Sequence, residues 1–230
     1  MSQEAPRRLV RAESILAGRQ RDFTVVLEDT HDPHNLSAVL RTCEAFGVQD
    51  VHLVIERNES PAINRDVSLG AHQWLTLHRH YGSAKAVEAL RTAGYKIYAA
   101  IVQPESIPLP TVRRDEKAAF VFGNEKSGLT ELWTQAADAC VAIPTCGFTG
   151  SLNLSVAVAV TIYDRLMGTA RSTLPEGTLD ETARRELRAV WYEKLAHGSD
   201  EVLDRYRAYL EDPPRPETIF PVDAHGVPRP

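Results

Sequence analysis

Short apolar runs alternate with segments of helical periodicity along most of this chain. The apolar runs predict strands at residues 23–28, 51–55, 74–78, 95–102, 118–122 and 139–143. The segments with apolar residues every three or four positions predict helices at residues 36–46, 83–93, 130–137 and 151–167. Parallel neighbouring strands need a crossover connection, which is usually a helix. The alternation therefore predicts an α/β fold, a mostly parallel sheet with helices on both faces.

The regions that flank this alternating core have a different composition. Residues 1–21 predict a short basic helix, and residues 171–210 predict one or two charged helices. Residues 211–230 contain six prolines and predict an extended tail. Of the 230 residues, 43% are hydrophobic, which is enough for one sizeable core. We place that core domain at residues 22–170.

Composition and spacing argue against several classes of protein. The chain has no run of 18 or more apolar residues that could span a membrane, and its polar, basic start lacks the apolar stretch of a secretory signal. The three cysteines have no CxxC spacing, so we expect free thiols in a reducing cytoplasm, with Cys140 and Cys146 buried. His78 and His80 have no evident cluster of further ligands, so we expect no metal site.

The charge of the chain is unevenly distributed. The formal net charge is −5, which argues against a surface that binds nucleic acid everywhere. Residues 1–21, however, hold five arginines against two glutamates, and a basic arm can dock on a phosphate backbone. A solvated helix face has the same composition, so both interpretations stay open.

Three of the expected strands are followed by a polar turn and then by a helix. These turns lie at residues 33–41, 122–129 and 143–155, and each contains an amide or a charged side chain. In α/β sheets, ligands bind at the carboxyl ends of the strands, where such turns lie. We therefore expect the three turns to form one composite site.

The polar residues of these turns also have simpler interpretations. Helix capping is one explanation for Asn35, Ser151 and Asn153. Glu125 has an alternative role as a charge that complements the dipole of the helix expected from residue 130. For Arg41, the alternative is a buried ion pair with Glu125 or Glu44.

Two common nucleotide-binding fingerprints are absent from the sequence. No GxGxxG occurs, and Glu125 stands where the phosphate-binding pattern GxxxxGK[ST] needs its second glycine. An acid at that place would repel a triphosphate. A conventional nucleotide-binding α/β fold is therefore disfavoured.

The three turns, taken together, carry a family resemblance. The first motif reads HNLSAVLRT at residues 34–42, and the second reads FGNEKSGL at residues 122–129. The third motif reads IP at residues 143–144 followed by SLNLSVA at residues 151–157. In this order and at these separations they resemble the TrmH family of the SPOUT superfamily, the ribose 2′-O-methyltransferases that use S-adenosylmethionine. The resemblance covers roughly residues 20–168.

The resemblance implies an α/β knot fold, in which the C-terminal segment threads a loop to form a deep trefoil knot. It also implies a homodimer whose active sites are each completed by the partner subunit, with S-adenosylmethionine bound in the knotted loops. The short basic N-terminal helix and the helical C-terminal extension resemble the branch that methylates guanosine 18 in the tRNA D-loop. Methylation of 23S rRNA and RNA binding without catalysis are the alternatives.

The resemblance also assigns roles to positions of this chain. The catalytic group implied is Arg41, Asn35, Glu125, Ser151 and Asn153. The implied cofactor-binding residues are Ala100, Gly123, Ile143 and Leu152, and the implied RNA contacts are Arg7, Arg8, Arg11, Arg19 and His34. One departure concerns the basic run that the tRNA branch has after the third motif, because residues 165–171 contain only two arginines.

Overall fold

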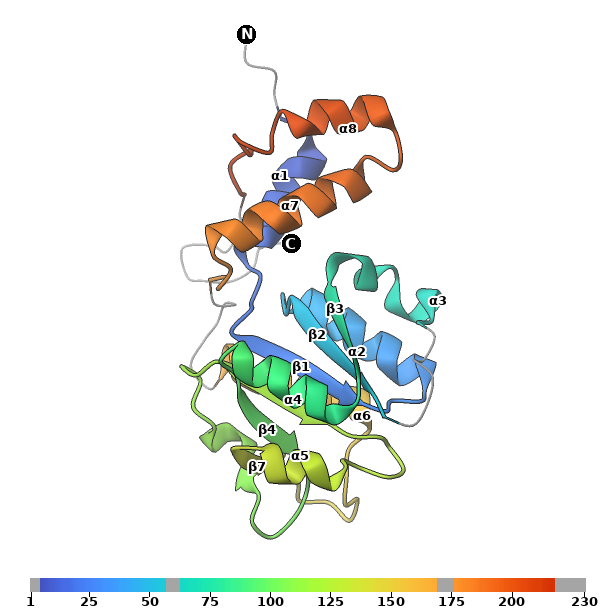
Figure 1. Cartoon of the computed structure of the whole chain (residues 1–230), viewed down its shortest axis with the longest axis vertical. Helices are drawn as coiled ribbons and strands as arrows, with labels where there is room; N and C mark the ends of the chain where they lie inside the picture. Colours follow the sequence, from blue (N-terminus) through green and yellow to red (C-terminus); the bar gives the residue numbers. More distant parts are fainter. Residues whose placement is uncertain (1–4, 57–62, 169–175, 218–230) are drawn as a thin grey trace. The chain divides into compact units, whose positions relative to one another are not determined.

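A parallel sheet forms the centre of the larger part of the molecule (Figure 1). Within residues 5–56, 63–168 and 176–217, which this computed structural model describes, seven strands pair in the order β3-β2-β1-β6-β4-β7-β5. They are β1 (Phe23–Glu28), β2 (Asp50–Ile55), β3 (Thr76–Tyr81), β4 (Lys96–Ala100), β5 (Ile107–Pro108), β6 (Ala118–Phe122) and β7 (Ala139–Ala142). All residues of β1, β2 and β6 are buried, as expected for a parallel sheet covered on both faces. The predicted α/β class is confirmed.

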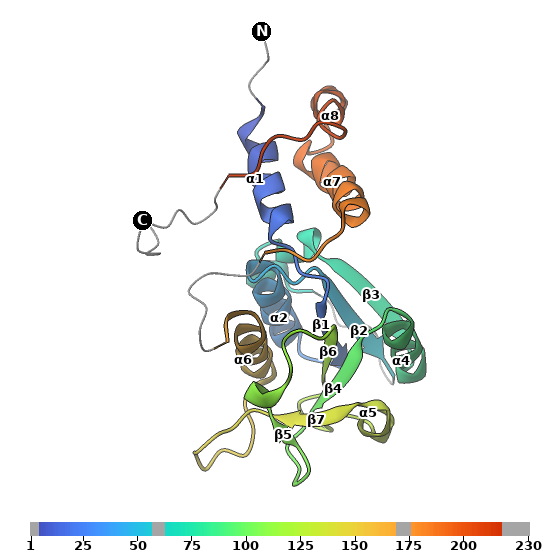
Figure 2. The ribbon, with the colours of Figure 1, turned by 90° about the vertical axis from the view of Figure 1, so that its left-hand side faces the viewer.

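Helices cover both faces of this sheet (Figure 2). α2 (Pro33–Ala45) and α6 (Leu154–Met167) lie on one face, and α4 (Ser83–Thr92) and α5 (Glu131–Ala136) lie on the other. Consecutive strand residues point to opposite faces, so Phe120 belongs to the core with α2 and α6, whereas Val121 belongs to the core with α4 and α5. Three short helical segments complete this part of the chain: α3 (Arg65–Ser68), η1 (Ala71–Trp74) and η2 (Leu109–Thr111).

The boundaries of some elements differ from the predictions for local reasons. The strand predicted from residue 74 begins at Thr76, because Ala71–Trp74 form a 3-10 turn. α6 begins at Leu154 and not at Ser151, because the Asn153 side chain accepts a hydrogen bond from the Ser155 amide and caps the helix there. β5 was not predicted, since it has only two residues.

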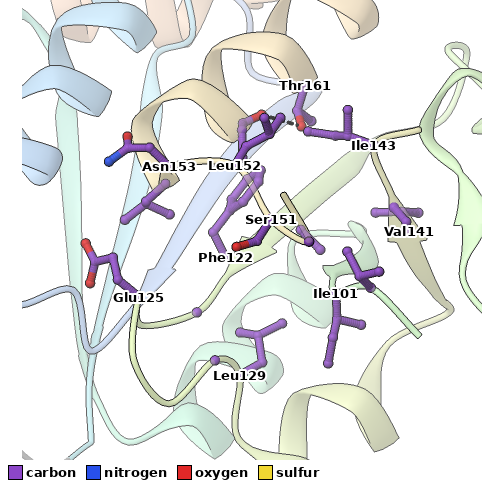
Figure 3. A pocket seen from close by; sticks show the side chains of 18 of the residues that line it. Ile101, Phe122, Glu125, Leu129, Val141, Ile143, Ser151, Leu152, Asn153 and Thr161 are labelled. Atoms are coloured by element: carbon purple, nitrogen blue, oxygen red, sulfur yellow. Dashed lines mark hydrogen bonds between the residues drawn. The ribbon is translucent and has the colours of Figure 1, made fainter. Parts of the chain in front are cut away.

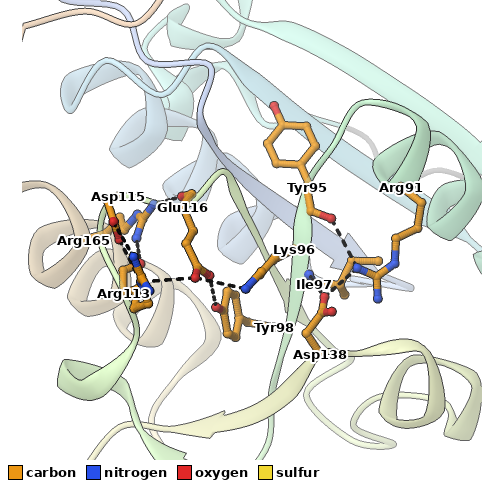
Figure 4. Close-up of polar contacts among 10 residues, drawn as sticks. All are labelled: Arg91, Tyr95, Lys96, Ile97, Tyr98, Arg113, Asp115, Glu116, Asp138 and Arg165. Carbon is orange, nitrogen blue, oxygen red and sulfur yellow. Dashed lines mark hydrogen bonds and ion pairs between the residues drawn. The ribbon is translucent and has the colours of Figure 1, made fainter.

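A network of polar contacts ties α6 to the segment that precedes β6 (Figure 4). Arg165 of α6 is buried and donates to the backbone carbonyls of Arg113 and Glu116. The Glu116 carboxylate in turn accepts hydrogen bonds from Lys96 and Tyr98 of β4, each at 3.0 Å. Arg165, which begins the sparse basic run after the third motif, is thus used for internal packing, and Arg171 lies outside the described residues.

The sheet and its helices form one compact unit, Arg21–Arg171, which we call the sheet unit. Met1–Gln20 and Ser172–Pro230 together form a second one, the helical unit. It contains α1 (Arg7–Ala17), α7 (Glu181–Leu195) and α8 (Asp200–Arg207), and α1 packs against α7. Most of the linker expected after the core, and the tail beyond residue 217, lie outside the described residues.

A buried ion pair joins α1 to α7 within the helical unit. The Glu13 carboxylate, 5% exposed, accepts hydrogen bonds from Arg188 at 2.8 and 2.9 Å and from the Tyr192 hydroxyl at 2.9 Å. The hydrogen bonds to Glu13 raise the pKa of Arg188, and burial raises the pKa of Tyr192. Removing one member of such a pair leaves a buried charge, at a cost of roughly 3–5 kcal/mol. α1 is therefore a structural part of the helical unit.

The strand order requires the chain to return to the middle of the sheet late in the sequence. After β4 the chain forms β5 at one edge, and then β6 lies between β1 and β4. β7 next lies between β4 and β5. The trefoil knot implied by the resemblance stays a prediction.

Candidate active site

A pocket of about 540 Å³ lies at the carboxyl ends of β4, β6 and β7 (Figure 3). Ala100 ends β4, Phe122 ends β6, and the segment from Val141 to Thr145 runs out of β7. The turn before α6 and the inward face of α6, which includes Thr161, close the remaining side. The position of the pocket agrees with the general preference of α/β sheets for ligand binding at this edge.

The pocket brings together seven of the residues that the sequence singled out. Ala100, Gly123, Ile143 and Leu152, the expected cofactor-binding residues, all line it, as do Glu125, Ser151 and Asn153. Sequence reasoning missed Thr161 and the apolar part of the lining, chiefly Ile101, Val102, Leu129 and Val141. The neighbouring motifs were the signal for most of these residues. Thr161 had none, because it is one more small residue on an apolar helix.

Three side chains from three different turns form a hydrogen-bonded chain beside the pocket. The Asn35 amide nitrogen donates to Glu125 Oε1 at 2.8 Å, and the Asn153 amide nitrogen donates to Asn35 Oδ1 at 3.1 Å. The Asn153 oxygen accepts from the Ser155 amide at 2.9 Å. Each amide group therefore has a fixed orientation, and the carboxylate of Glu125 is held against Asn35.

The three residues that were possible helix caps, Asn35, Ser151 and Asn153, differ in whether they cap a helix. α2 starts at Pro33, and its cap is Asp32, which accepts from the His34 amide at 2.8 Å. The capping interpretation of Asn35 is therefore wrong, and its amide is available for Glu125 and Asn153. Asn153 caps α6, whereas Ser151 lies three residues before the helix. Capping is correct for Asn153 and wrong for Ser151.

Arg41 lies on the exposed side of α2 and does not line the pocket. Within the described part of the chain its side chain forms no hydrogen bond and no ion pair, so the interpretation as a buried ion pair with Glu125 or Glu44 is wrong. An exposed guanidinium without an internal partner is available to an external group, such as an RNA phosphate or a second subunit.

The second motif forms a closed loop at the edge of the pocket. Asn124 and Gly128 exchange two backbone hydrogen bonds, of 3.2 and 2.9 Å. The Asn124 side chain donates to the Asp29 carbonyl at 2.7 Å and accepts from the Lys126 and Ser127 amides. A Cβ atom on Gly123 would lie 2.3 Å from the backbone carbon of Gly128, so only glycine allows the loop to close this tightly.

The five expected RNA contacts lie in different environments. Arg7, Arg8 and Arg11 are exposed on α1, and His34 is exposed at the start of α2. Arg19, in contrast, is fully buried in the helical unit, with its guanidinium 5.0 Å from the ring centroid of Trp191. The buried side chain of Arg19 is therefore not accessible to an RNA phosphate in this structure.

Several general expectations concern the described residues as a whole. No helix among them has the length and apolarity needed to cross a membrane, and they contain no group of three or more His, Cys, Asp or Glu residues placed to hold a metal ion. All three cysteines are free. Cys140 is half-buried and Cys146 is exposed, so the expectation that both are buried is wrong.

Comparison with known proteins identifies the family. The model of the SpoU rRNA Methylase family matches residues 22–163. The chain belongs to this family. The resemblance seen in the three motifs is therefore confirmed, and the match falls on the sheet unit that contains the pocket.

Individual proteins match this chain over a larger share of its length than the family model does. A tRNA (guanosine(18)-2′-O)-methyltransferase of Borreliella burgdorferi is 39% identical over 80% of this chain and 84% of its own length. The crystal structure of a TrmH/SpoU tRNA modifying enzyme of A. aeolicus has a TM-score of 0.65 at 24% identity, covering 90% of this chain and 96% of that one. An AdoMet-bound rRNA methyltransferase of Sinorhizobium meliloti has a TM-score of 0.57 at 22% identity over 71% of this chain and 60% of its own.

Proposed function

We propose that this protein transfers a methyl group from S-adenosylmethionine to the ribose 2′-hydroxyl of guanosine 18 in tRNA. The observation that carries the proposal is the pocket that the second and third motifs line, with Asn35 of the first motif bonded to its rim. Membership of a methylase family and the 39% identity to a tRNA guanosine-18 methyltransferase support the same reaction.

The pocket fits the methyl donor in size and in chemistry. Its volume of about 540 Å³ is in the usual range for sites of small organic ligands. Ile101, Leu129 and Val141 offer apolar contact. Ala100, Gly123 and Ile143 also line the wall, where their backbone N–H and C=O groups can bind the polar parts of the donor. Glu125 places a carboxylate at the rim, which suits a ligand with a positively charged sulfonium. S-adenosylmethionine supplies an activated methyl group when bound in this pocket.

The hydrogen-bonded chain at the rim positions the acceptor. A ribose hydroxyl is a poor nucleophile and must lose its proton as the new bond forms, and alignment of the reacting atoms supplies much of the acceleration. Asn35 is held by Glu125 and Asn153 in one orientation, so it presents a fixed rim to the ribose. Ser151 is exposed before the start of α6, where it can contact a ribose or phosphate oxygen.

Arg41 is the residue that we expect to be essential for turnover. An arginine side chain stays protonated in proteins, so it is a poor general base by itself. Its positive charge stabilises the alkoxide that develops on the ribose, or it orients an RNA phosphate that accepts the proton of the 2′-hydroxyl. Because Arg41 is exposed and does not line the pocket of its own chain, either role requires RNA or a second subunit to complete the site.

We further propose that the active protein is a homodimer with composite sites. α6 exposes a row of apolar side chains, with Val156 46%, Val160 37% and Tyr163 55% exposed. A second copy of the chain on this face would bury the row and would close the site beside the third motif. A tRNA substrate supports the further proposal that the protein acts in the cytoplasm.

Methyl transfer to two acceptors tests the proposed function. Labelled S-adenosylmethionine is incubated with unmodified tRNA transcript or with 23S rRNA, and the nucleosides are analysed. We expect 2′-O-methylguanosine in tRNA only, no product with R41A, and a normal amount with R79A, which removes another exposed arginine. Label in rRNA alone would retain the chemistry but contradict the substrate, and no label in either would contradict the enzymatic activity.

A further inference from the structure

A fully buried carboxylate lies behind the second motif and has no part in the mechanism above. Glu28 is the last residue of β1 and is 1% exposed. Its Oε1 accepts hydrogen bonds from the Ser83 hydroxyl at 2.8 Å and from the Thr130 hydroxyl at 2.7 Å. Its Oε2 accepts from the Thr130 backbone amide at 2.8 Å. A carboxylate without such donors is very costly to bury, so these contacts are needed for the group to lie there.

The partners of Glu28 are themselves held in the core. The Ser83 hydroxyl accepts a hydrogen bond from the indole nitrogen of Trp133 at 2.9 Å, and Trp133 is fully buried. Ser83 begins α4, and Thr130 directly precedes α5. Glu28 therefore joins the end of β1 to the starts of both helices on that face of the sheet.

The same contacts fix the second motif at its far end. Leu129, which lines the pocket, is the residue before Thr130. At the near end, the Asn124 side chain donates to the carbonyl of Asp29, the neighbour of Glu28. The last residue of β1 and the residue after it thus hold the loop 123–129 at both ends, Asp29 through its backbone carbonyl and Glu28 through its buried carboxylate.

We propose that Glu28 is a positioning residue, which sets the affinity for the methyl donor by holding the far end of the loop 123–129. This inference rests on the proposed function, because the ligand of the pocket is taken to be S-adenosylmethionine. Without the carboxylate, Thr130 and Leu129 lose their attachment to β1 and the wall of the pocket shifts. Glu125, in the same loop, keeps its contact with Asn35 at the rim, so the loss falls mainly on donor binding.

The substitutions E28Q and T130V remove parts of this attachment. In E28Q an amide N–H replaces one acceptor oxygen, so a buried hydrogen-bond donor is left without a partner. If the loop shifts to avoid this unpaired donor, the affinity for the methyl donor should fall about tenfold. T130V removes one hydroxyl donor and keeps the backbone amide, whereas T130S keeps both. E13Q is the matched control, because Glu13 is also a buried carboxylate and accepts three hydrogen bonds in the helical unit.

Calorimetric titration with S-adenosylmethionine, together with kcat and the donor KM on tRNA, tests the inference. We expect E28Q and T130V to raise the donor Kd and KM about tenfold with kcat at saturating donor within about twofold. T130S should behave as wild type, and E13Q should lower the melting temperature without changing the donor Kd. Unchanged donor affinity in E28Q, or an equal loss in E13Q, would overturn the inference. If the wild-type chain itself binds no donor, the proposed function fails and the inference fails with it.

Discussion

Gly123 occupies a position where the backbone of the second motif leaves no room for a side chain. A Cβ atom there would lie 2.3 Å from the Gly128 carbon and 2.4 Å from the Leu129 nitrogen. Both contacts are with backbone, which cannot rotate away as a side chain can. We predict that G123A opens the loop and abolishes measurable donor binding in calorimetry.

Gly147 gives the matched control for this substitution. A Cβ atom at Gly147 would meet only the Thr149 nitrogen, at 3.9 Å, which is an ordinary contact distance. G147A should therefore bind the donor with wild-type affinity. Normal donor binding by G123A would contradict the close approach of Gly123 to the backbone of Gly128 and Leu129.

Three histidines, His52 on β2 and His78 and His80 on β3, form a stacked cluster in the sheet unit. His52 is buried, its ring stacks on those of His78 and His80 with centroids 4.5 and 5.1 Å away, and its Nδ1 lies 2.8 Å from Nε2 of His80. Burial, followed by the neighbouring histidines, lowers the pKa of His52 to about 3. Asp50 and Arg21 complete the group, since Asp50 contacts both His78 and Arg21.

Acid should destabilise the sheet unit through His52. The ordinary pKa of histidine in an unfolded chain is about 6.5, so below that pH the unfolded state binds a proton that the folded state excludes. Stability from this group is complete above pH 6.5 and is lost as the pH falls towards 3. At pH 5 the loss is about 2 kcal/mol.

Urea titrations at pH 7.5 and pH 5.0 measure this effect in the wild type and in H52Q. The loss of unfolding free energy between the two pH values should be about 2 kcal/mol smaller in H52Q, which has no imidazole to protonate. An identical loss in both proteins would show that His52 is protonated in the folded state at pH 5.

At the scale of elements, the sequence predicted most strands and helices because each has a clear period. β1 and β6 were predicted with the observed bounds, since both are short apolar runs. The start of α6 was misplaced because Ser151 and Asn153 are equally good caps in the sequence, and only the chain path decides between them. The contact of Asn35 with Glu125 joins elements 90 residues apart, so no local pattern could place it.

α1 combines a buried and a basic face, which determines how its role in RNA binding is tested. Leu9, Glu13 and Leu16 are buried, so deletion of the whole helix would disrupt the helical unit. The triple substitution R7A/R8A/R11A changes only exposed side chains. We predict that it weakens tRNA binding and lowers the slope of log affinity against log salt concentration by roughly 2, through the loss of phosphate contacts.

Filter binding of tRNA across a range of salt concentrations measures this slope, with R205A/R207A on α8 as the comparison. Those arginines are also exposed in the helical unit but lie on another helix. An unchanged slope in the triple variant would remove α1 from the RNA-binding surface.

At the scale of the whole molecule, two arrangements lay beyond sequence reasoning. The pairing of α1 with α7 depends on Glu13 and Arg188, which are 175 positions apart. The order of the strands, with β6 between β1 and β4, likewise follows from long-range packing and not from any local period. The family resemblance, in contrast, led to the functional loops because they are short and local motifs.

The exposed apolar row on α6 gives the prediction for the assembly. V160R places a charge in the middle of this row and should convert a dimer into a monomer with little remaining methyl transfer. V190R, on α7, introduces the same charge at another exposed valine and should leave the dimer intact. Sedimentation velocity distinguishes these states, and a V160R protein that stays dimeric would contradict the assignment of this face.

The position of the methyl group on tRNA is the measurement that we consider decisive. Two transcripts that differ only in guanosine or adenosine at position 18 are incubated with the protein and labelled S-adenosylmethionine, and the modified nucleotide is mapped by mass spectrometry. We predict one 2′-O-methylguanosine at position 18 of the first transcript and no label in the second. Label at another position, or equal label in both transcripts, would contradict the proposed function.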